Sequence, residues 1–326
     1  MSTQTQLCPC CSGVAYEACC KPLHDGQMPS TALALMRSRY AAYALCIPEY
    51  IVQTTHPASP QFSLDTEQWL QDIEAFCKET TFERLEILSS HEQDNLANVV
   101  FVAHLTKNEE NASFTEKSFF EKRQGKWLYR SGQLTEGHAP HLVTTNQPRL
   151  LPLAYYGDPI LTKEAERIHA IDDDLRKLVE EMIETMDACD GIGLAAPQVH
   201  HSIKLFVMHN PVEKGNKTLF QGVKVMLNPE ISSPSADTST ISEGCLSIPT
   251  IHADVQRPSE ITIEYTDMQG TRLKERVKGW AARIIQHEND HLNGILFIDR
   301  LSESEKQKLQ PFLEHLKNRI HDGTEL

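Results

Sequence analysis

The chain has 326 residues, of which 40% are hydrophobic and 23% charged, and its formal net charge is −14. This length is sufficient for two domains, and the acidic balance argues against general binding to DNA or another nucleic-acid backbone. No stretch approaches the roughly 18 apolar residues needed to span a membrane. The first residues lack the basic end and apolar core of an export signal, so we expect a cytoplasmic protein.

The cysteines are concentrated at the N-terminus, where five of the nine fall within the first twenty residues. In a cytosolic protein such a cluster indicates a metal site rather than disulfide bonds. Four thiolates would form a closed, structural tetrahedral zinc site. The alternative is a reduced tail of free cysteines. The clustered residues are Cys8, Cys10, Cys11, Cys19 and Cys20.

Two helices followed by an antiparallel meander are predicted for the first part of the chain. The first helix is Ala-rich with a Ser or Thr start and apolar spacing. The strands are rich in β-branched and aromatic residues and are separated by polar turns. Helices first and a meander afterwards indicate an α+β unit that is complete by Gly132. The helices are predicted at 30–46 and 65–79, and the strands at 82–90, 97–106, 114–123 and 126–132.

A linker at 136–148 separates this unit from a second one, because the segment lacks periodicity and ends in Pro. The clearest helix lies at 172–191, where apolar residues follow the i, i+3, i+4, i+7 pattern and the methionines are expected in the core. Pro311 is expected to end or kink the first turn of the last helix. The other elements are strands at 202–209, 222–229 and 259–267 and helices at 278–294 and 304–320.

The sequence HENDH places His287 and His291 one helical turn apart, with Glu288 next to the first of them. This H-E-x-x-H pattern is typical of zinc hydrolases, most often proteases. Isolated matches also occur by chance in a helix that happens to hold two histidines. Here Ile284 and Ile285 would bury the helix, and a buried Glu beside two His is costly without a compensating charge. We therefore interpret the segment as part of a metal site.

A catalytic metal usually takes three protein ligands plus water, so one ligand is missing. The residues after His291 read LNGILFIDRL and contain no His at the position that metzincins use. Upstream, SEGCLSIP contains Cys245, although a lone Cys in apolar surroundings is usually an inert core thiol. A third segment, GIGLAAPQ at 191–198, has two closely spaced glycines but lacks the third glycine of a dinucleotide fingerprint.

Together and in this order, the segments G-x-G-L-A-A-x-Q, E-G-C-L-S and Q-H-E-x-D-H-L-x-G resemble the motifs of the peptide deformylases. The resemblance covers roughly residues 148–320. It implies that 149–326 is a catalytic domain with an α+β fold, in which antiparallel sheets surround the central H-E-x-x-H helix. It also implies metal-dependent hydrolysis of the formyl group from the N-terminal formyl-methionine of newly made polypeptides, with release of formate.

The same resemblance implies a ligand set of one thiolate and two imidazoles, carried here by Cys245, His287 and His291. Thiolate and imidazole suit iron and zinc alike, and the family often works with Fe²⁺, so we expect iron first and zinc as the alternative. The family also pairs Arg257 with Asp290 in the interior, beside the metal helix. The alternative for these two is a pair of unrelated surface charges.

The remaining site residues also follow from the resemblance. Glu288 is expected to take a proton from the attacking water and to give it to the leaving amine. The backbone N–H of Leu246 and the side-chain amide of Gln198 are expected to stabilise the oxyanion. Gly193 lets the substrate backbone approach closely. The positions of three apolar residues suggest a pocket for the methionine side chain, although core packing would explain each of them equally well: Ile192, Ile241 and Trp280.

The N-terminal segment CPCCSGVAYEACC resembles the SEC-C motif, a small zinc-binding hairpin at 1–24. The resemblance implies that Cys8, Cys10, Cys19 and Cys20 bind Zn²⁺, whereas Cys11 stands where the motif commonly has Gly. Residues 25–135 resemble the YchJ-like proteins with an NTF2-like α+β fold, a family without a settled activity. SEC-C modules often mediate protein contacts. We therefore expect this half to dock the enzyme to a partner near nascent chains or the ribosome.

Two other functions remain open from the residues alone. An H-E-x-x-H endopeptidase would cleave unformylated peptides internally and would use a third ligand other than Cys245. A zinc-stabilised adaptor with a degenerate hydrolase domain would show no turnover. The intact H-E-x-x-H residues argue against the adaptor.

Overall fold

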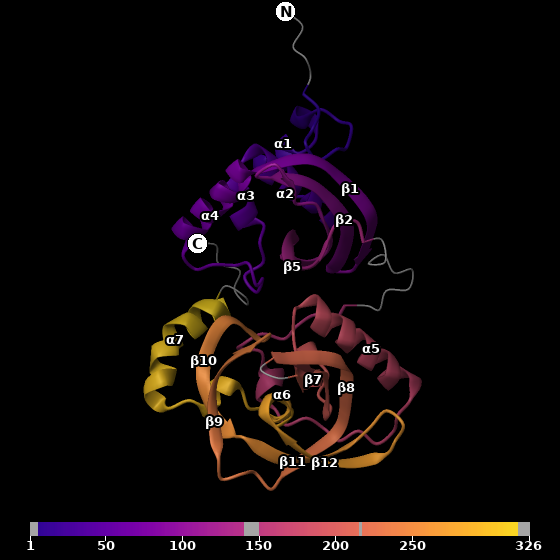
Figure 1. The fold of residues 1–326 in the computed structure, drawn as a ribbon, viewed down its shortest axis with the longest axis vertical. Coiled ribbons are helices and arrows are strands. Elements are labelled where there is room, and N and C mark those ends of the chain that lie inside the picture. Colours follow the sequence, from indigo (N-terminus) through magenta and orange to yellow (C-terminus); the bar gives the residue numbers. More distant parts are fainter. Residues whose placement is uncertain (1–5, 140–149, 215–216, 319–326) are drawn as a thin grey trace, which may run out of the picture. The chain divides into compact units, whose positions relative to one another are not determined.

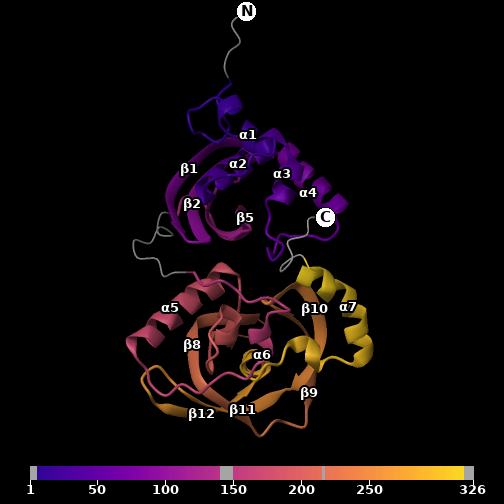
Figure 2. The same ribbon diagram turned by 180° about the vertical axis from the view of Figure 1, so that it is seen from behind.

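The computed structural model describes residues 6–139, 150–214 and 217–318. The chain divides into two compact units, Met1–Gln147 and Pro148–Leu326, which Figures 1 and 2 show from opposite sides. Most of the predicted linker at 136–148 lies outside the described residues. Across the described ranges, no helix is long and apolar enough to cross a membrane.

The first unit begins with a cysteine-containing turn and continues with helices that pack on a curved antiparallel sheet (Figure 1). The strand order is β1-β2-β4-β5, with the short β3 paired to β2. Both predicted helices and the four-stranded meander are confirmed. The elements are η1 (Tyr16–Ala18), α1 (Lys21–His24), α2 (Ala32–Leu45), α3 (Pro48–Gln53), α4 (Thr66–Glu79), β1 (Thr80–Gln93), β2 (Leu96–Lys107), β3 (Glu110–Asn111), β4 (Phe114–Arg123) and β5 (Lys126–Glu136).

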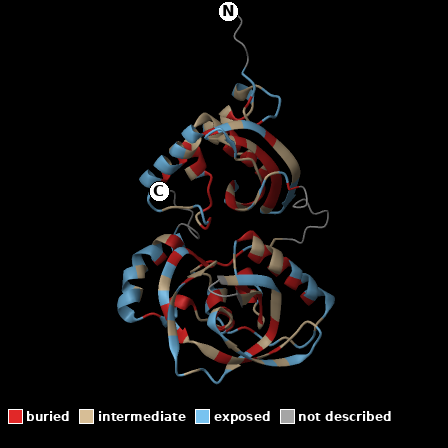
Figure 3. Ribbon diagram, in the orientation of Figure 1, coloured by how far each residue is buried: buried red, intermediate tan, exposed pale blue. Residues whose placement is uncertain are grey.

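Side-chain caps begin the two longer helices of this unit. Thr31 caps α2 by accepting a hydrogen bond from the backbone of Ala34, and Asp65 caps α4 in the same way from Gln68. The strand β2 is buried along most of its length (Figure 3), which matches its near-continuous apolar sequence. The helices and the concave face of the sheet therefore share one hydrophobic core.

The second unit contains a five-stranded antiparallel sheet of order β12-β11-β8-β7-β6 and a two-stranded sheet of β9 and β10. The strands surround α6, which Figures 1 and 2 show near the middle of the unit. The elements are η3 (Pro159–Thr162), α5 (Asp173–Ala188), β6 (Gly193–Ala195), η4 (Ala196–Val199), β7 (Leu205–Lys214), β8 (Lys217–Ser232), β9 (Thr238–Cys245), β10 (Ile248–Pro258), β11 (Glu260–Thr266), β12 (Arg272–Lys278), α6 (Gly279–Leu292), η5 (Phe297–Arg300) and α7 (Glu303–Lys317).

Burial in this unit follows the predicted apolar pattern. Met182 and Met186 of α5 are fully buried, as expected for core residues. Ile284, Ile285 and Leu292 of α6 pack into the core between the helix and the five-stranded sheet. The central helix is therefore held by its apolar residues, and its polar residues face other neighbours.

The expectation for Pro311 was wrong. Pro311 lies well inside α7, which runs through it from Glu303 to Lys317. Ser302 and Glu305 form a capping box that starts the helix, so the first turn is fixed before the proline is reached. A proline inside a helix loses one backbone hydrogen bond, and here the burial of Leu313 and Leu316 compensates for that loss.

Candidate metal centre and active site

Helix α6 brings together the histidines of the H-E-x-x-H segment. The helix starts at Gly279, whose φ of 60° is a conformation that favours glycine. The ring centroids of His287 and His291 lie 5.1 Å apart, as expected for i, i+4 neighbours. Glu288 lies between them in the sequence, and its side chain is buried. The helix thus presents two imidazoles and a carboxyl group to one region of the interior.

Cys245 supplies a thiol to the same place from a different element. It ends β9 and pairs with Ile248, which begins β10, so it lies at a tight strand connection. Its Sγ lies 3.3 Å from Nε2 of His291. One ligand atom from each of Cys245, His287 and His291 falls within 4.8 Å of the others. The three residues are therefore close enough to share one ion.

The chemistry of this donor set fits a divalent transition metal. Burial opposes ionisation of the Cys245 thiol, but the neighbouring His291 and His287 outweigh it and hold the pKa of Cys245 well below its usual range. A thiolate and two imidazoles suit iron and zinc. Nδ1 of His291 is buried and, among the described residues, has no hydrogen-bond partner. Its other ring nitrogen, Nε2, faces Sγ of Cys245 at 3.3 Å and is therefore the atom positioned to bind a metal.

Glu243 is the charged residue that organises the surroundings of the thiol and the imidazoles. Its carboxylate accepts hydrogen bonds from Arg257 at 2.7 and 2.9 Å, from Arg283 at 2.8 Å and from Nδ1 of His287 at 2.9 Å. Burial alone would raise the pKa of Glu243, but Arg257 and His287 outweigh burial and hold that pKa well below its usual range. Arg257 also donates to Asp290 at 2.7 Å, and both residues are buried, which confirms the expected ion pair.

The sequence analysis did not single out Glu243 or Arg283. Glu243 lies inside the E-G-C-L-S segment, two residues before Cys245, so its position in that segment was the available signal. Arg283 lies one turn before His287 on α6, and no local pattern indicates that it bonds to β9. Glu243 bonds to Arg283 and His287, which lie 40 and 44 positions away in the chain, and a single sequence does not reveal such contacts.

The carboxyl group of Glu288 is buried. Its Oε2 is enclosed and, within the part of the chain that the structure describes, makes no hydrogen bond. Burial raises the pKa of Glu288 to about 7. Gly193 of β6 leaves the space that the carboxyl occupies, because a Cβ on Gly193 would lie 2.3 Å from Oε1 of Glu288. The lack of a side chain at Gly193 is therefore what leaves room for the carboxyl group of Glu288.

The side-chain amide of Gln198 also approaches the thiol of Cys245. Its Nε2 is 3.5 Å from Sγ of Cys245 and 3.2 Å from Oγ of Ser247, while its Oε1 accepts a hydrogen bond from the backbone of Ala195. These bonds fix which end of the amide faces the thiol. Leu246 follows Cys245 directly, so its backbone N–H lies at the same strand connection. The structure thus brings together Gln198, Leu246, Glu288 and the three potential ligands.

Comparison with known proteins identifies the family to which the second unit is similar. Residues 150–307 match the sequence model described as polypeptide deformylase. The chain is 43% identical over 155 residues to the peptide deformylase of Thermotoga sp. (strain RQ2), an alignment that spans 48% of this chain and 89% of that protein. The chain belongs to the peptide deformylase family.

Other peptide deformylases align over the same part of the chain. The enzyme from Picosynechococcus sp. (strain ATCC 27264) is 44% identical over 152 residues, which span 46% of this chain and 79% of that protein. A crystal structure of the Thermotoga maritima peptide deformylase is 42% identical and covers 47% of this chain and 99% of its own, with a TM-score of 0.42. The identities to the two curated relatives confirm the predicted family for the second unit.

Membership of the peptide deformylase family defines the reaction. The chain is a metal-dependent hydrolase that removes the formyl group from nascent peptides. This assignment excludes the endopeptidase and the inactive adaptor as descriptions of the second unit. In the first unit, residues 31–132 match the model described as the middle NTF2-like domain of YchJ, which confirms the predicted NTF2-like fold.

The three residues expected to form the pocket of the deformylase for methionine differ in exposure. Ile192 is 39% exposed and directly precedes Gly193. Ile241 of β9 is half-buried and pairs with Val255. Trp280, near the start of α6, packs against the core of the five-stranded sheet. Their role in binding stays a prediction.

The first unit contains a second group of potential ligands. The Sγ atoms of Cys8, Cys10, Cys19 and Cys20 all lie within 4.8 Å of one another. Hydrogen bonding to Cys20 lowers the pKa of Cys10 to about 4, whereas burial raises the pKa of Cys8 to about 11. Cys11 is exposed and its Sγ lies 3.4 Å from the backbone N of Leu85, outside the group. Four of the five clustered cysteines thus converge.

Proposed function

We propose that Cys245, His287 and His291 hold the catalytic metal of this deformylase, with Fe²⁺ as the native ion and Zn²⁺ as the alternative. The convergence of the three ligand atoms within 4.8 Å is the observation that carries this proposal. A divalent cation bound there supplies Lewis acidity and lowers the pKa of a coordinated water toward about 7. The donor set alone suits either ion, and the preference for iron rests on family resemblance.

The proton transfers belong to Glu288. Its unpaired Oε2 accepts a proton from the attacking water and later passes it to the leaving amine, which becomes the free N-terminus of methionine. A pKa near 7 supports both roles, because the carboxyl can accept and release a proton near neutral pH. A general base of this kind contributes about 10²–10⁴ in rate.

The amide of Gln198 and the backbone N–H of Leu246 stabilise the negative charge that develops on the formyl oxygen. Because Oε1 of Gln198 already accepts from Ala195, its Nε2 is the end that remains turned toward the thiol. Donors positioned in advance avoid reorganisation during the reaction, and one of them is worth about 2.7–4 kcal/mol. Gly193 admits the substrate backbone. Ile192, Ile241 and Trp280 form the contact for the methionine side chain.

Formate release from a formyl-methionyl peptide tests these assignments. We expect Glu288→Gln to lower kcat by about 10²–10⁴ without loss of metal. Cys245→Ser should lose both metal and activity, whereas Cys189→Ser, at a buried cysteine outside the ligand group, should retain them. Activity retained in Glu288→Gln or Cys245→Ser would contradict the proposed site. Metal analysis after anaerobic purification distinguishes iron from zinc.

For the rest of the chain we propose a SEC-C-like hairpin at 1–24 that binds structural Zn²⁺, an NTF2-like domain at 25–135, a linker at 136–148 and the catalytic domain at 149–326. The four converging cysteines support the zinc hairpin. We further propose that the first unit docks the enzyme to the ribosome or a nearby protein in the cytoplasm, where nascent formylated chains are available. Unchanged ribosome association and cellular deformylation after deletion of residues 1–140 would refute the docking role.

A further inference from the structure

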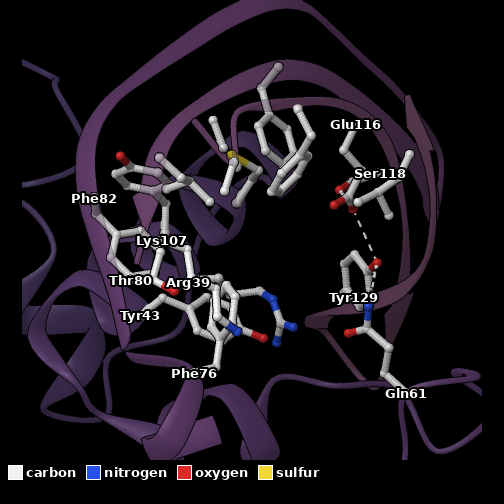
Figure 4. Close-up of a pocket in the computed structure, with 18 of the residues that line it drawn as sticks. Arg39, Tyr43, Gln61, Phe76, Thr80, Phe82, Lys107, Glu116, Ser118 and Tyr129 are labelled. Carbon is white, nitrogen blue, oxygen red and sulfur yellow. Dashed lines mark hydrogen bonds between the residues drawn. The ribbon is translucent and has the colours of Figure 1, made fainter. Parts of the chain in front are cut away.

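The first unit contains a cavity of about 400 Å³ between its helices and the concave face of its sheet (Figure 4). This volume lies within the range of small-molecule sites in proteins. Most of the lining is apolar, and aromatic rings contribute much of it. Six of the aromatic rings that line it belong to Tyr43, Phe76, Phe82, Phe101, Phe114 and Phe120.

One side of the cavity is polar and is built around a buried carboxyl group. Oε1 of Glu116, on β4, accepts hydrogen bonds from Oγ of Ser118 at 2.5 Å and from the hydroxyl of Tyr129 at 3.1 Å. Nε2 of Gln61 in turn donates to the Tyr129 oxygen at 3.3 Å. Figure 4 shows these four side chains gathered on the same side. Both of the hydrogen bonds that the Glu116 carboxyl accepts go to Oε1, not to Oε2.

The neighbouring strand makes room for this carboxyl. Gly132 of β5 pairs with Ser118 of β4, and a Cβ on Gly132 would lie 2.1 Å from Oε1 of Glu116 and 2.7 Å from the Tyr129 hydroxyl. Any side chain at this position would therefore displace the acid and its hydrogen-bond donor. The absence of a side chain here is what allows the polar group to form.

The cavity also contains potential hydrogen-bond donors. Burial raises the pKa of Glu116, which favours the protonated carboxyl, and a protonated Oε2 would be a hydrogen-bond donor. The guanidinium of Arg39 lies 4.6 Å from the ring centroid of Tyr129, and its Nη1 donates to the uncharged oxygens of Ile51, Thr54 and Thr55. The hydroxyl of Thr80 lines another side of the cavity, near Tyr43 and Phe82 (Figure 4), where it is buried and has no hydrogen-bond partner among the described residues. A ligand that offers an acceptor oxygen would pair with the protonated carboxyl of Glu116.

An unfilled core is the competing explanation for the cavity. A packing defect lined by aromatic rings would not require a buried acid, since a buried carboxyl without compensation is costly. Nor would it require a glycine that leaves space for that acid. The combination of an apolar volume with one oriented polar group is instead the usual composition of a ligand site.

We propose that this cavity binds a small ring-containing apolar molecule that carries a hydrogen-bond-accepting oxygen, a carbonyl or a carboxylate, directed at Glu116. The aromatic lining contacts the rings of the ligand, and Oε2 of Glu116 donates to its oxygen. Arg39 favours a carboxylate over a neutral carbonyl. The site is separate from the residues that act on the formyl group.

Three probes with the same ring system test the proposal on the full-length, metal-loaded protein by calorimetry: naphthoate, acetylnaphthalene and ethylnaphthalene. The two probes with an acceptor should bind about tenfold tighter than ethylnaphthalene, which lacks one. Glu116→Leu should abolish this preference, and Gly132→Ala, which displaces the carboxyl without removing it, should do the same. Ala103→Trp should block all three probes by filling the cavity.

Controls separate the cavity from the catalytic centre. Glu67→Gln, an exposed substitution on α4, should leave binding unchanged. Saturating probe should leave formate release unchanged, and Glu288→Gln should bind the probes like the wild type. The proposal is overturned if none of the probes binds, if all three bind equally, or if folded Glu116→Leu and Gly132→Ala keep the preference. Competition between the probes and a formyl-methionyl peptide would also overturn it.

Discussion

Nδ1 of His287 lies 2.9 Å from Oε2 of Glu243, and the same carboxylate is bonded to Arg257 and Arg283. A carboxylate in this position fixes the orientation of the imidazole and leaves its other nitrogen for a metal. The two arginines hold the carboxylate in turn. The geometry of one ligand therefore depends on residues from β9, β10 and α6.

Substitution of Glu243 should weaken the metal site without removing a ligand. We expect Glu243→Gln to lower metal affinity by about 10–100-fold, because the amide no longer balances two arginines or favours one tautomer of His287. Excess metal should restore part of the activity. Glu230→Gln, which alters a carboxylate that pairs with Arg167 on the surface, is the control. Equal metal affinity in both variants would rule out this role.

A methyl group at position 193 should disturb the general base. The added Cβ of Gly193→Ala would lie 2.3 Å from Oε1 of Glu288, so the carboxyl must move. Misplacement by about 1 Å can cost about 10² in rate, and we expect a loss of that order in kcat while metal content stays constant. Gly222→Ala, where the added Cβ meets nothing within 4 Å but the φ of +70° strains an alanine, controls for the cost of a strained Gly→Ala change away from Glu288. A similar loss of kcat in the control would contradict the steric explanation.

The N-terminal cysteines should differ in their contribution to zinc binding. Cys8→Ser removes a converging thiol and should lower zinc affinity by more than about 100-fold, with a lower melting temperature. Cys11→Ser should retain zinc, because Cys11 lies outside the converging group. Zinc retention is measured by competition with a chromogenic chelator. Loss of zinc from Cys11→Ser alone would reverse the assignment.

The buried acid of the first unit should make stability depend on pH. Because burial raises the pKa of Glu116, the folded chain keeps this carboxyl protonated where the unfolded chain has released its proton. Its contribution to stability therefore falls as pH rises above about 4.3, the ordinary value for Glu. Glu116→Gln should remove that decline, so its gain over the wild type in urea unfolding should grow as pH rises from about 4.3 toward the raised pKa of the folded state. The control Glu67→Gln should show no such trend.

Local patterns predicted most of the helices and the strands of the first unit. The apolar spacing around Met182 and the Asp residues before it were sufficient for α5. β9 and β10 were missed because β9 alternates exposed and half-buried Ser and Thr residues, with little apolar signal. The continuation of α7 through Pro311 also depends on tertiary packing, which a propensity rule does not include.

The site was predictable where its residues lie in short motifs. His287, Glu288 and His291 follow from helical spacing, and Cys245 and Gln198 from family resemblance. The bonds from Glu243 to Arg257 and Arg283 were not predictable, because they depend on how β9, β10 and α6 pack. The cavity beside Glu116 was also hidden, since its polar side combines residues from β4, β5 and the segment before α4.

The position of Cys245 has a mechanical consequence. This residue ends a strand of the two-stranded sheet, whereas both histidines lie on a helix whose apolar side chains pack on the five-stranded sheet. A cation bound by all three would therefore act as a cross-link between the two layers of the second unit. Oxidation of that one sulfur would release the cross-link as well as stop the reaction, so inactivation and loosening of the fold would occur in the same event.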